Sequence, residues 1–261
     1  IRVRIGRFGP FLQQGEGVQH DHWLKEVDAR YLRLRLQGGP GPDYALAELQ
    51  VRDLAWASDA NGFFSALAAR APRGAYPRAY RQEQSYWTVV GIDGGHLQAL
   101  LSEDGALEPG LGLGSVEPFL VADGQWISWA DARISHRLPP GGLPLPTVQW
   151  QAQHLSLTIT AFGQGDRQAH QAVARYRVRN QGVAPRKVDL VLAVRPFQVN
   201  PPSQFLNIAG GVTPLRRLAW REGVLAINGQ PVLHPLQAPA RVAVAPFEGA
   251  DLATLYRGGR H

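Results

Sequence analysis

The sequence predicts an all-β protein, built as an antiparallel β-sandwich with one short helix. Runs of four to eight residues in which apolar and polar side chains alternate recur along the chain, which is typical of strands with one buried face. The 29 glycines and 20 prolines supply frequent turn signals between these runs. Only residues 62–70 show a helical pattern. Many short strands separated by turns favour antiparallel sheets packed face to face.

The first predicted element is a strand at residues 31–36, where Leu32, Leu34 and Leu36 share one face. The glycine- and proline-rich stretch 38–43 interrupts it, and residues 44–51 resume as a second strand. Together they predict the end of a small β unit, which we place in residues 1–55.

The spacing of apolar residues then changes from every second residue, as in a strand, to the period of about 3.6 residues that a helix has. Asp59 or Asn61 can cap a helix over residues 62–70, and Pro72 and Gly74 end it. We therefore expect a helical linker in residues 56–80.

Strand patterns return in residues 81–261, which we expect to form one β-sandwich domain. The expected strands are residues 86–92, 97–101, 119–122, 134–138, 148–153, 155–161, 173–179 and 188–194. The turn residues 180–185 predict that the last two of these strands form an antiparallel hairpin. Asn228-Gly229 predicts a second hairpin, between residues 224–227 and 231–233.

The amino-acid composition limits the classes of partner that we expect for this chain. The net charge is +6, but all except two of the 27 basic residues are arginines spread along the chain, and several alternate with apolar residues, as in Arg33-Leu34-Arg35. This pattern is typical of a solvated sheet face, so we expect no nucleic acid as partner. The absence of cysteine excludes disulfides and thiolate chemistry. Because no apolar run reaches 18 residues, we expect no membrane partner.

The chain starts with Ile1-Arg2-Val3-Arg4, which is no signal peptide, and it contains no methionine. We expect it to be a processed or excised piece of a longer protein. Its compartment stays open, with a periplasmic or extracellular location favoured over the cytoplasm.

The loop that follows the strand at residues 188–194 is the first candidate binding site. Pro201 and Pro202 fix the backbone, so the polar side chains around them are expected on a rigid rim. Amides and a guanidinium suit sugar hydroxyls. The candidate ligand-binding residues here are Arg195, Gln198, Asn200, Gln204 and Asn207.

The second candidate is the segment in which Trp126 and Trp129 come shortly before Asp131. An indole face can stack on a pyranose ring while a neighbouring carboxylate binds its hydroxyls. The alternative is that these rings fill the sandwich core, as aromatic residues commonly do.

Metal binding and catalysis find little support. His20-Asp21-His22 has the spacing of a metal pair on a strand, but no third ligand is apparent, so a polar turn is the default and no metal or cofactor is expected. Glycoside hydrolysis needs two carboxylates about 5–9 Å apart, a separation that sequence cannot supply. No catalytic residue is assigned, and Glu103-Asp104-Gly105 is expected to be a hairpin turn. The carboxylates considered are Glu103, Asp104, Glu108, Glu117, Asp123 and Asp131.

Five phrases occur in a particular order: residues 83–91 (EQSYWTVVG), 102–108 (SEDGALE), 116–120 (VEPFL), 129–131 (WAD) and the loop 195–207. In this order they resemble a group of large bacterial proteins. In that group a discoidin-type domain (coagulation factor 5/8 type C, galactose-binding-like) precedes a β-supersandwich and an (α/α)6 barrel of glycoside hydrolase or phosphorylase type.

The resemblance implies that residues 1–55 are the C-terminal part of a galactose-binding-like jelly roll and residues 81–261 a supersandwich of galactose mutarotase-like type. The catalytic barrel would lie beyond His261. The implied role is therefore the noncatalytic β-sandwich portion of a carbohydrate-active protein, with the barrel and an oligo- or polysaccharide as partners. The loop 195–207 and the segment 126–131 would help to shape the substrate cleft.

Three roles remain open at this point. A stand-alone lectin-like module predicts sugar affinity that Trp129→Ala abolishes. A pure scaffold predicts no sugar affinity and an exposed apolar patch for the docking domain. An enzyme with its own site predicts a carboxylate pair across a cleft.

Overall fold

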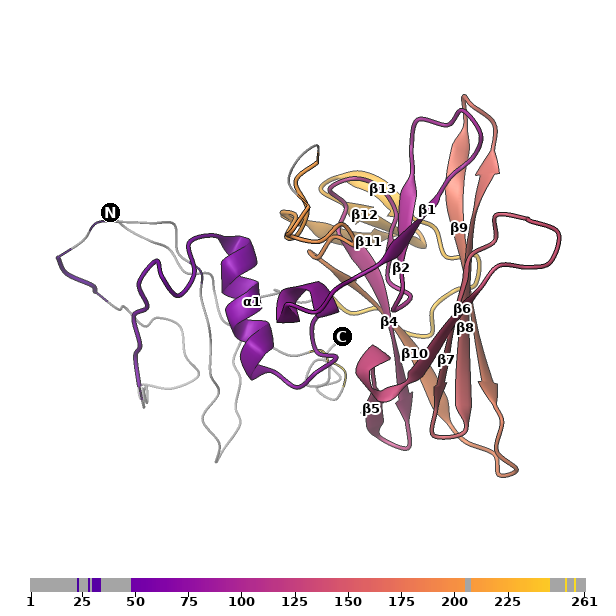
Figure 1. Cartoon of the computed structure of the whole chain (residues 1–261), viewed down its shortest axis with the longest axis horizontal. Coiled ribbons are helices and arrows are strands. Elements are labelled where there is room, and N and C mark those ends of the chain that lie inside the picture. The colour runs from indigo at the N-terminus through magenta and orange to yellow at the C-terminus, as the bar shows by residue number, and fades with distance from the viewer. Residues whose placement is uncertain are drawn as a thin grey trace.

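The computed structural model describes residues 23, 28, 30–33, 48–204, 208–244, 252 and 256. Two antiparallel sheets pack in a sandwich, and the helix α1 lies beside one of them (Figure 1). The predicted all-β class is confirmed. Of the two strands expected before residue 52, residues 31–33 and 48–51 form no regular element, and the remainder lies outside the described residues.

The helix α1 (Ala60–Arg70) forms as predicted, starting two residues earlier. Asp59 is its N-cap, and its side chain accepts the N–H of Gly62 at 2.7 Å. Asn61 has a different role, since its Oδ1 accepts the N–H of Val212 at 2.7 Å and ties the helix to a distant loop. No helix in the described part of the chain has the length and apolarity needed to cross a lipid bilayer.

The first sheet has the strand order β1-β2-β3-β4-β10, with β5 paired to β4. Its strands are β1 (Trp87–Val90), β2 (Ala99–Ser102), β3 (Leu107–Glu108), β4 (Ser115–Ala122), β5 (Gln125–Ile127) and β10 (Val188–Arg195). All eight residues of β4 are buried, because both of its faces are covered. Leu120 and Ala122 belong to the sandwich core, whereas Phe119 packs against the ring of Trp126.

The second sheet has the order β6-β7-β8-β9, and a smaller third sheet has the order β11-β12-β13. The strands are β6 (Arg133–Arg137), β7 (Thr147–Ala152), β8 (Leu155–Gly165), β9 (His170–Asn180), β11 (Leu218–Arg221), β12 (Val224–Ile227) and β13 (Gln230–Leu233). Asn228 and Gly229 both have positive φ and join β12 to β13, which confirms the predicted hairpin.

The core lies between the first and second sheets. Trp150, Leu157 and Ile159 enter it from the second sheet and meet Leu101 and Leu120 of the first. Each is at most 2% exposed, and burying a side chain of this size contributes roughly 1.5–3 kcal/mol. Alternating apolar residues along strands of both sheets therefore account for the sandwich.

The predicted hairpin across residues 180–185 is wrong. β9 pairs with β8 and β10 pairs with β4, so the connection between them crosses from the second sheet to the first. Both strands turn an apolar face to the same core, and alternation alone does not specify which neighbour each takes. Arg186 in the connection is bound by Asp123 and by the carbonyl of Gln153.

Candidate functional site

Strand β10 ends at Arg195 and a loop follows it, as predicted, but the guanidinium does not lie on an open rim. Arg195 is only 4% exposed. Its Nε donates to Oε1 of Glu117 at 2.8 Å, its Nη2 donates to the other carboxylate oxygen, and its Nη1 donates to the carbonyl of Ala75 at 2.6 Å. The expectation that Arg195 faces solvent is wrong, because a buried carboxylate from the neighbouring strand claims it.

Gln198 is also buried, at 7% exposure, which corrects its expected place on the rim. Its backbone N–H donates to the carbonyl of Gly211 at 2.9 Å, and its side-chain Nε2 donates to the carbonyl of Ala209 at 3.3 Å. Its neighbour Phe197 is fully buried, with its ring centroid 4.8 Å from that of Tyr80. The start of the loop is thus part of the interior.

Glu108 draws the loop inward. Its carboxylate is 2% exposed and accepts the backbone N–H groups of Val199 at 2.9 Å and Asn200 at 3.2 Å. Burial raises the pKa of this carboxyl, and the two N–H donors oppose that rise. A single buried side chain therefore satisfies two consecutive loop amides that the sheet leaves unpaired.

The remaining loop candidates differ in exposure. Asn200 is half-buried, and its side-chain Nδ2 donates to the carbonyl of Ile208 at 3.2 Å. Gln204 is exposed, as expected of a rim residue. Asn207 lies outside the described residues.

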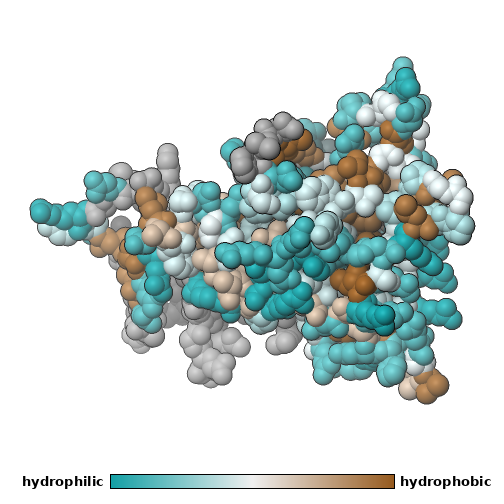
Figure 2. Space-filling model, viewed as in Figure 1, coloured by the Kyte–Doolittle hydropathy of each residue, from teal (hydrophilic) through white to brown (hydrophobic). Residues whose placement is uncertain are grey.

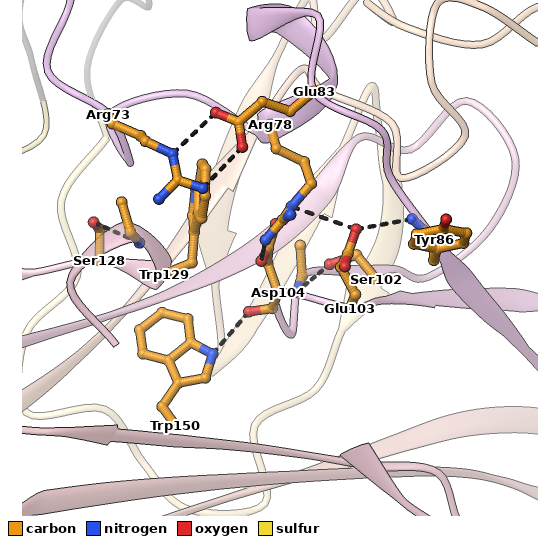
Figure 3. A network of polar contacts seen from close by, with 12 residues as sticks. Arg73, Arg78, Glu83, Tyr86, Ser102, Glu103, Asp104, Ser128, Trp129 and Trp150 are labelled. Carbon is orange, nitrogen blue, oxygen red and sulfur yellow. Dashed lines mark hydrogen bonds and ion pairs between the residues drawn. The ribbon is translucent and has the colours of Figure 1, made fainter. Parts of the chain in front are cut away.

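Trp129 begins the 3-10 helix η2 (Trp129–Asp131) and is 6% exposed. Its Nε1 donates to the carbonyl of Tyr76 at 3.2 Å. The guanidinium carbons of Arg73 and Arg78 lie 4.4 and 4.7 Å from the centroid of its ring (Figure 3). The indole is therefore occupied by protein groups, and it does not form the open stacking platform that the sequence suggested.

The other two members of that segment are partly open. Asp131 is exposed, but its Oδ2 accepts the N–H and the hydroxyl of Ser128 at 2.8 and 2.7 Å, which completes a capping box. Trp126 is half-buried, with its ring 5.1 Å from that of Phe119 and 5.8 Å from that of Tyr256.

A network of ion pairs surrounds Trp129 (Figure 3). Arg78 of the 3-10 helix η1 (Arg78–Arg81) forms a bidentate pair with Asp104, at 2.7 and 2.5 Å, and its Nε lies 3.4 Å from Glu103. Hydrogen bonding to Asp104 raises the pKa of Arg78. Arg73 pairs with Glu83 at 3.0 and 2.8 Å, and this bond lowers the pKa of Glu83. As predicted, Glu103 and Asp104 occupy the turn between β2 and β3, and they bind the linker from there.

A small hollow lies beside this network, lined in part by Arg78, Trp129 and Gln198. Its volume is about 40 Å³. Pockets for small organic ligands have volumes of roughly 300–1,000 Å³, whereas one water needs roughly 10–15 Å³. The hollow fits a few waters and is too small for a pyranose ring.

No family model, curated protein or solved structure matches this chain. Function is therefore inferred from its own residues. Within the described ranges, no three His, Asp or Glu side chains are grouped as metal ligands, and His20 and His22 lie outside these ranges. Asp104 and Glu117 each bind an arginine, so the site's chemistry is that of ion pairs holding backbone segments together.

We call this assembly the joint: the side chains of Arg78, Asp104, Glu117, Trp129 and Arg195, with the linker backbone at residues 75–76. Sequence reasoning missed the linker's arginines. One available signal was the alternation of arginine with tyrosine and proline over residues 72–81, since such arginines often lie on aromatic rings. A second signal was Glu117, a carboxylate inside an apolar strand, which demands a buried cationic partner.

Proposed function

We propose that this chain is the noncatalytic β-sandwich portion of a bacterial carbohydrate-active protein of glycoside hydrolase or phosphorylase type. In this role it supports a catalytic (α/α)6 barrel that acts on an oligo- or polysaccharide. One observation carries the supporting role: the chain's most distinctive polar residues face inward and fix the helical linker to the sandwich. They build a rigid joint and leave no open sugar cleft among them.

The joint is fixed at adjacent residues of the linker by side chains from two parts of the sandwich. Arg195 holds the carbonyl of Ala75, and Trp129 holds the carbonyl of Tyr76. In the opposite direction, the side chain of Arg78 in the linker donates to the carboxylate of Asp104, which lies in a turn of the sandwich. Contacts in both directions restrict rotation of the linker, which suits a domain that must hold its neighbours in a set orientation.

The carbohydrate class comes from the ordered phrases. Four of these phrases lie at or beside the joint. Residues 102–108 supply Asp104, and residues 116–120 supply Glu117. Residues 129–131 supply Trp129, and the loop 195–207 supplies Arg195. The residues that carry the resemblance are thus residues on which the fold depends, as expected for a scaffold shared among similar proteins.

The finer assignments stay part of this proposal. Residues 1–55 are assigned to a galactose-binding-like domain and residues 81–261 to a supersandwich. A stand-alone lectin-like module is the alternative, and the half-exposed ring of Trp126 is the observation that favours it. On the side of the molecule seen in Figure 2, brown groups are scattered among teal ones with no broad apolar area, so this side does not present the docking surface that a scaffold requires.

Titration calorimetry with neutral oligosaccharides separates the two roles. The scaffold role predicts no heat of binding. Affinity that Trp126→Ala abolishes would favour the lectin and overturn the scaffold, because this residue is not part of the joint. The reading frame downstream of residue 261 gives a second test: a region of helical repeats supports the scaffold, and a frame without one contradicts it.

A further inference from the structure

Five arginines point outward from the second sheet. Arg175, Arg177 and Arg179 alternate along β9 with residues that pack on the core, and Arg133 and Arg137 lie on β6 at the opposite edge. All five are exposed. Two groups that are some forty residues apart in sequence therefore share one face, because β6 and β9 are the two edges of this sheet.

The strand register turns this face into ordered rows. Arg133 and Arg179 end one row, and Gln151 and Ser156 lie between them on β7 and β8. Four residues along β9, Arg175 ends another row of this kind. Neighbouring strands lie about 4.8 Å apart, so the two edges are about 14 Å from each other.

The row that ends at Arg175 also has an arginine at its other end. Arg137 stands opposite Arg175, with Thr147 and Thr160 between them. The hydroxyls of these two threonines are 3.0 Å apart and bond each other. Hydroxyl and amide side chains thus form a floor, and guanidinium groups form the two rims. We call this surface the arginine trough.

Among the described residues, no carboxylate balances the charge of the trough. None of the strands β6 to β9 contains an Asp or a Glu. In the described part of the chain no carboxylate pairs with any of the five arginines. Asp131, two residues before Arg133 in the sequence, is engaged by the N–H and the hydroxyl of Ser128. Uncompensated like charges at this density attract an anionic partner.

The surface is also hollowed. A depression of about 190 Å³ lies over the sheet, bounded by Arg137, Arg177 and Arg179, with Gln149 and Thr158 among its floor residues. Figure 1 shows the second sheet on the far side of the first sheet from α1, so its outer face is turned away from the helix. The trough is thus separate from the joint.

We propose that the arginine trough binds an acidic polysaccharide, a chain of pyranose units that carry carboxylates. Guanidinium groups bind carboxylates through paired hydrogen bonds. The floor side chains that are exposed or half-buried, Gln149, Gln151 and Thr158, suit ring hydroxyls. The choice of a polysaccharide among polyanions rests on the carbohydrate role proposed above. A floor without aromatic rings also disfavours single-stranded nucleic acid, whose bases bind by stacking.

The test measures binding of polygalacturonate to the 261-residue chain by calorimetry, at low and at physiological salt. The variants are Arg177→Gln combined with Arg179→Gln, the single change Thr158→Val, and the control Arg221→Gln, an exposed arginine on the third sheet. The methyl-esterified polymer and single-stranded DNA serve as comparison ligands.

We expect the double variant to lose about tenfold or more in affinity, which corresponds to about 1.4 kcal/mol, and the control to bind as the wild type does. Thr158→Val should weaken binding about threefold, and the esterified polymer should bind poorly. Equal affinity of the double variant and Arg221→Gln would overturn the proposal, as would tighter binding of DNA than of polygalacturonate. Because the joint is not involved, this failure would leave the scaffold tests untouched.

Discussion

Single residues decide how the loop after β10 is oriented. Arg195 and Glu117 are both nearly inaccessible to solvent, at 5% and 6% side-chain exposure, and they bind each other through two hydrogen bonds. A buried ion pair gains little over an apolar pair of equal volume, but each partner alone is costly. The pair therefore fixes geometry, and its third contact, to Ala75, extends that geometry to the linker.

The Arg195–Glu117 pair gives the first residue-scale prediction. Arg195→Met should lower the free energy of unfolding by about 3–5 kcal/mol, because it leaves the Glu117 carboxylate buried without a cation. Combining it with Glu117→Met should recover part of that loss. Urea denaturation of the single and double variants measures both values. A double variant as unstable as the sum of the two single variants would show that the residues act independently.

Glu108 gives a prediction on pH. Burial raises its pKa in the folded protein, so the folded state holds this proton more tightly than the unfolded chain does. Its contribution to stability is then most favourable below the unfolded pKa of about 4.3 and is lost as pH rises through the folded pKa. Glu108→Gln keeps an acceptor for the two loop amides and removes this cost.

The stability of Glu108→Gln relative to the wild type should therefore increase as the pH rises from 4 to 7. Denaturant unfolding at several pH values measures this difference. A difference that stays constant across the range would contradict the assignment of a raised pKa, and Glu222→Gln, at an exposed position, is the matched control.

At the scale of elements, the helix α1 depends on its caps. Asp59→Ala should lower stability by about 1 kcal/mol, because the N–H of Gly62 loses its acceptor. Asp59→Asn retains an oxygen in the same place and should cost only a few tenths. Thermal or urea unfolding monitored by circular dichroism distinguishes them. Equal losses in both variants would mean that the charge of Asp59, and not its cap bond, matters.

Elements with a clear local signal could be predicted from the sequence, but their partners could not. The alternation over residues 155–161 and the cap at Asp59 are properties of neighbouring residues, and both appear in the structure. The strand that pairs with β9 is decided by how the two sheets assemble around the core. A short stretch of sequence carries no information about that assembly. For this reason the hairpin across residues 180–185 was predicted and does not form. β3 and β5, at two and three residues, are too short to show a period.

At the scale of the whole molecule, the same dependence on distant residues explains why the candidate site differs from the one that the sequence predicts. Pro201 and Pro202 predict a stiff backbone after β10, yet the direction in which Arg195 points depends on Glu117, 78 residues away. The arginine trough could not be predicted either, since only the sheet order places Arg133 and Arg179 on the same face, at its two edges. The sequence therefore predicts the chemical character of each segment, but it does not predict which distant residues come together in the fold.

The joint makes a prediction about cooperativity across the molecule. The 3-10 helix η1 couples two parts: Arg81 donates to the carbonyls of Ala68 and Ala71 at the end of α1, and Arg78 binds Asp104 in the sandwich. An eleven-residue helix is marginal by itself, so its protection from hydrogen exchange must come from this docking.

Arg78→Met should therefore increase amide exchange in residues 60–70 by about tenfold or more, while residues 147–165 of β7 and β8 keep their protection. Exchange measured by mass spectrometry on the wild type, on Arg78→Met and on Arg221→Gln tests this. If exchange rises equally in α1 and in β7 and β8, the variant has weakened the whole fold. If it rises in neither, the aromatic contacts of Phe64 and Tyr80 with Phe197 hold the linker without the ion pair, and the joint is not the coupling element.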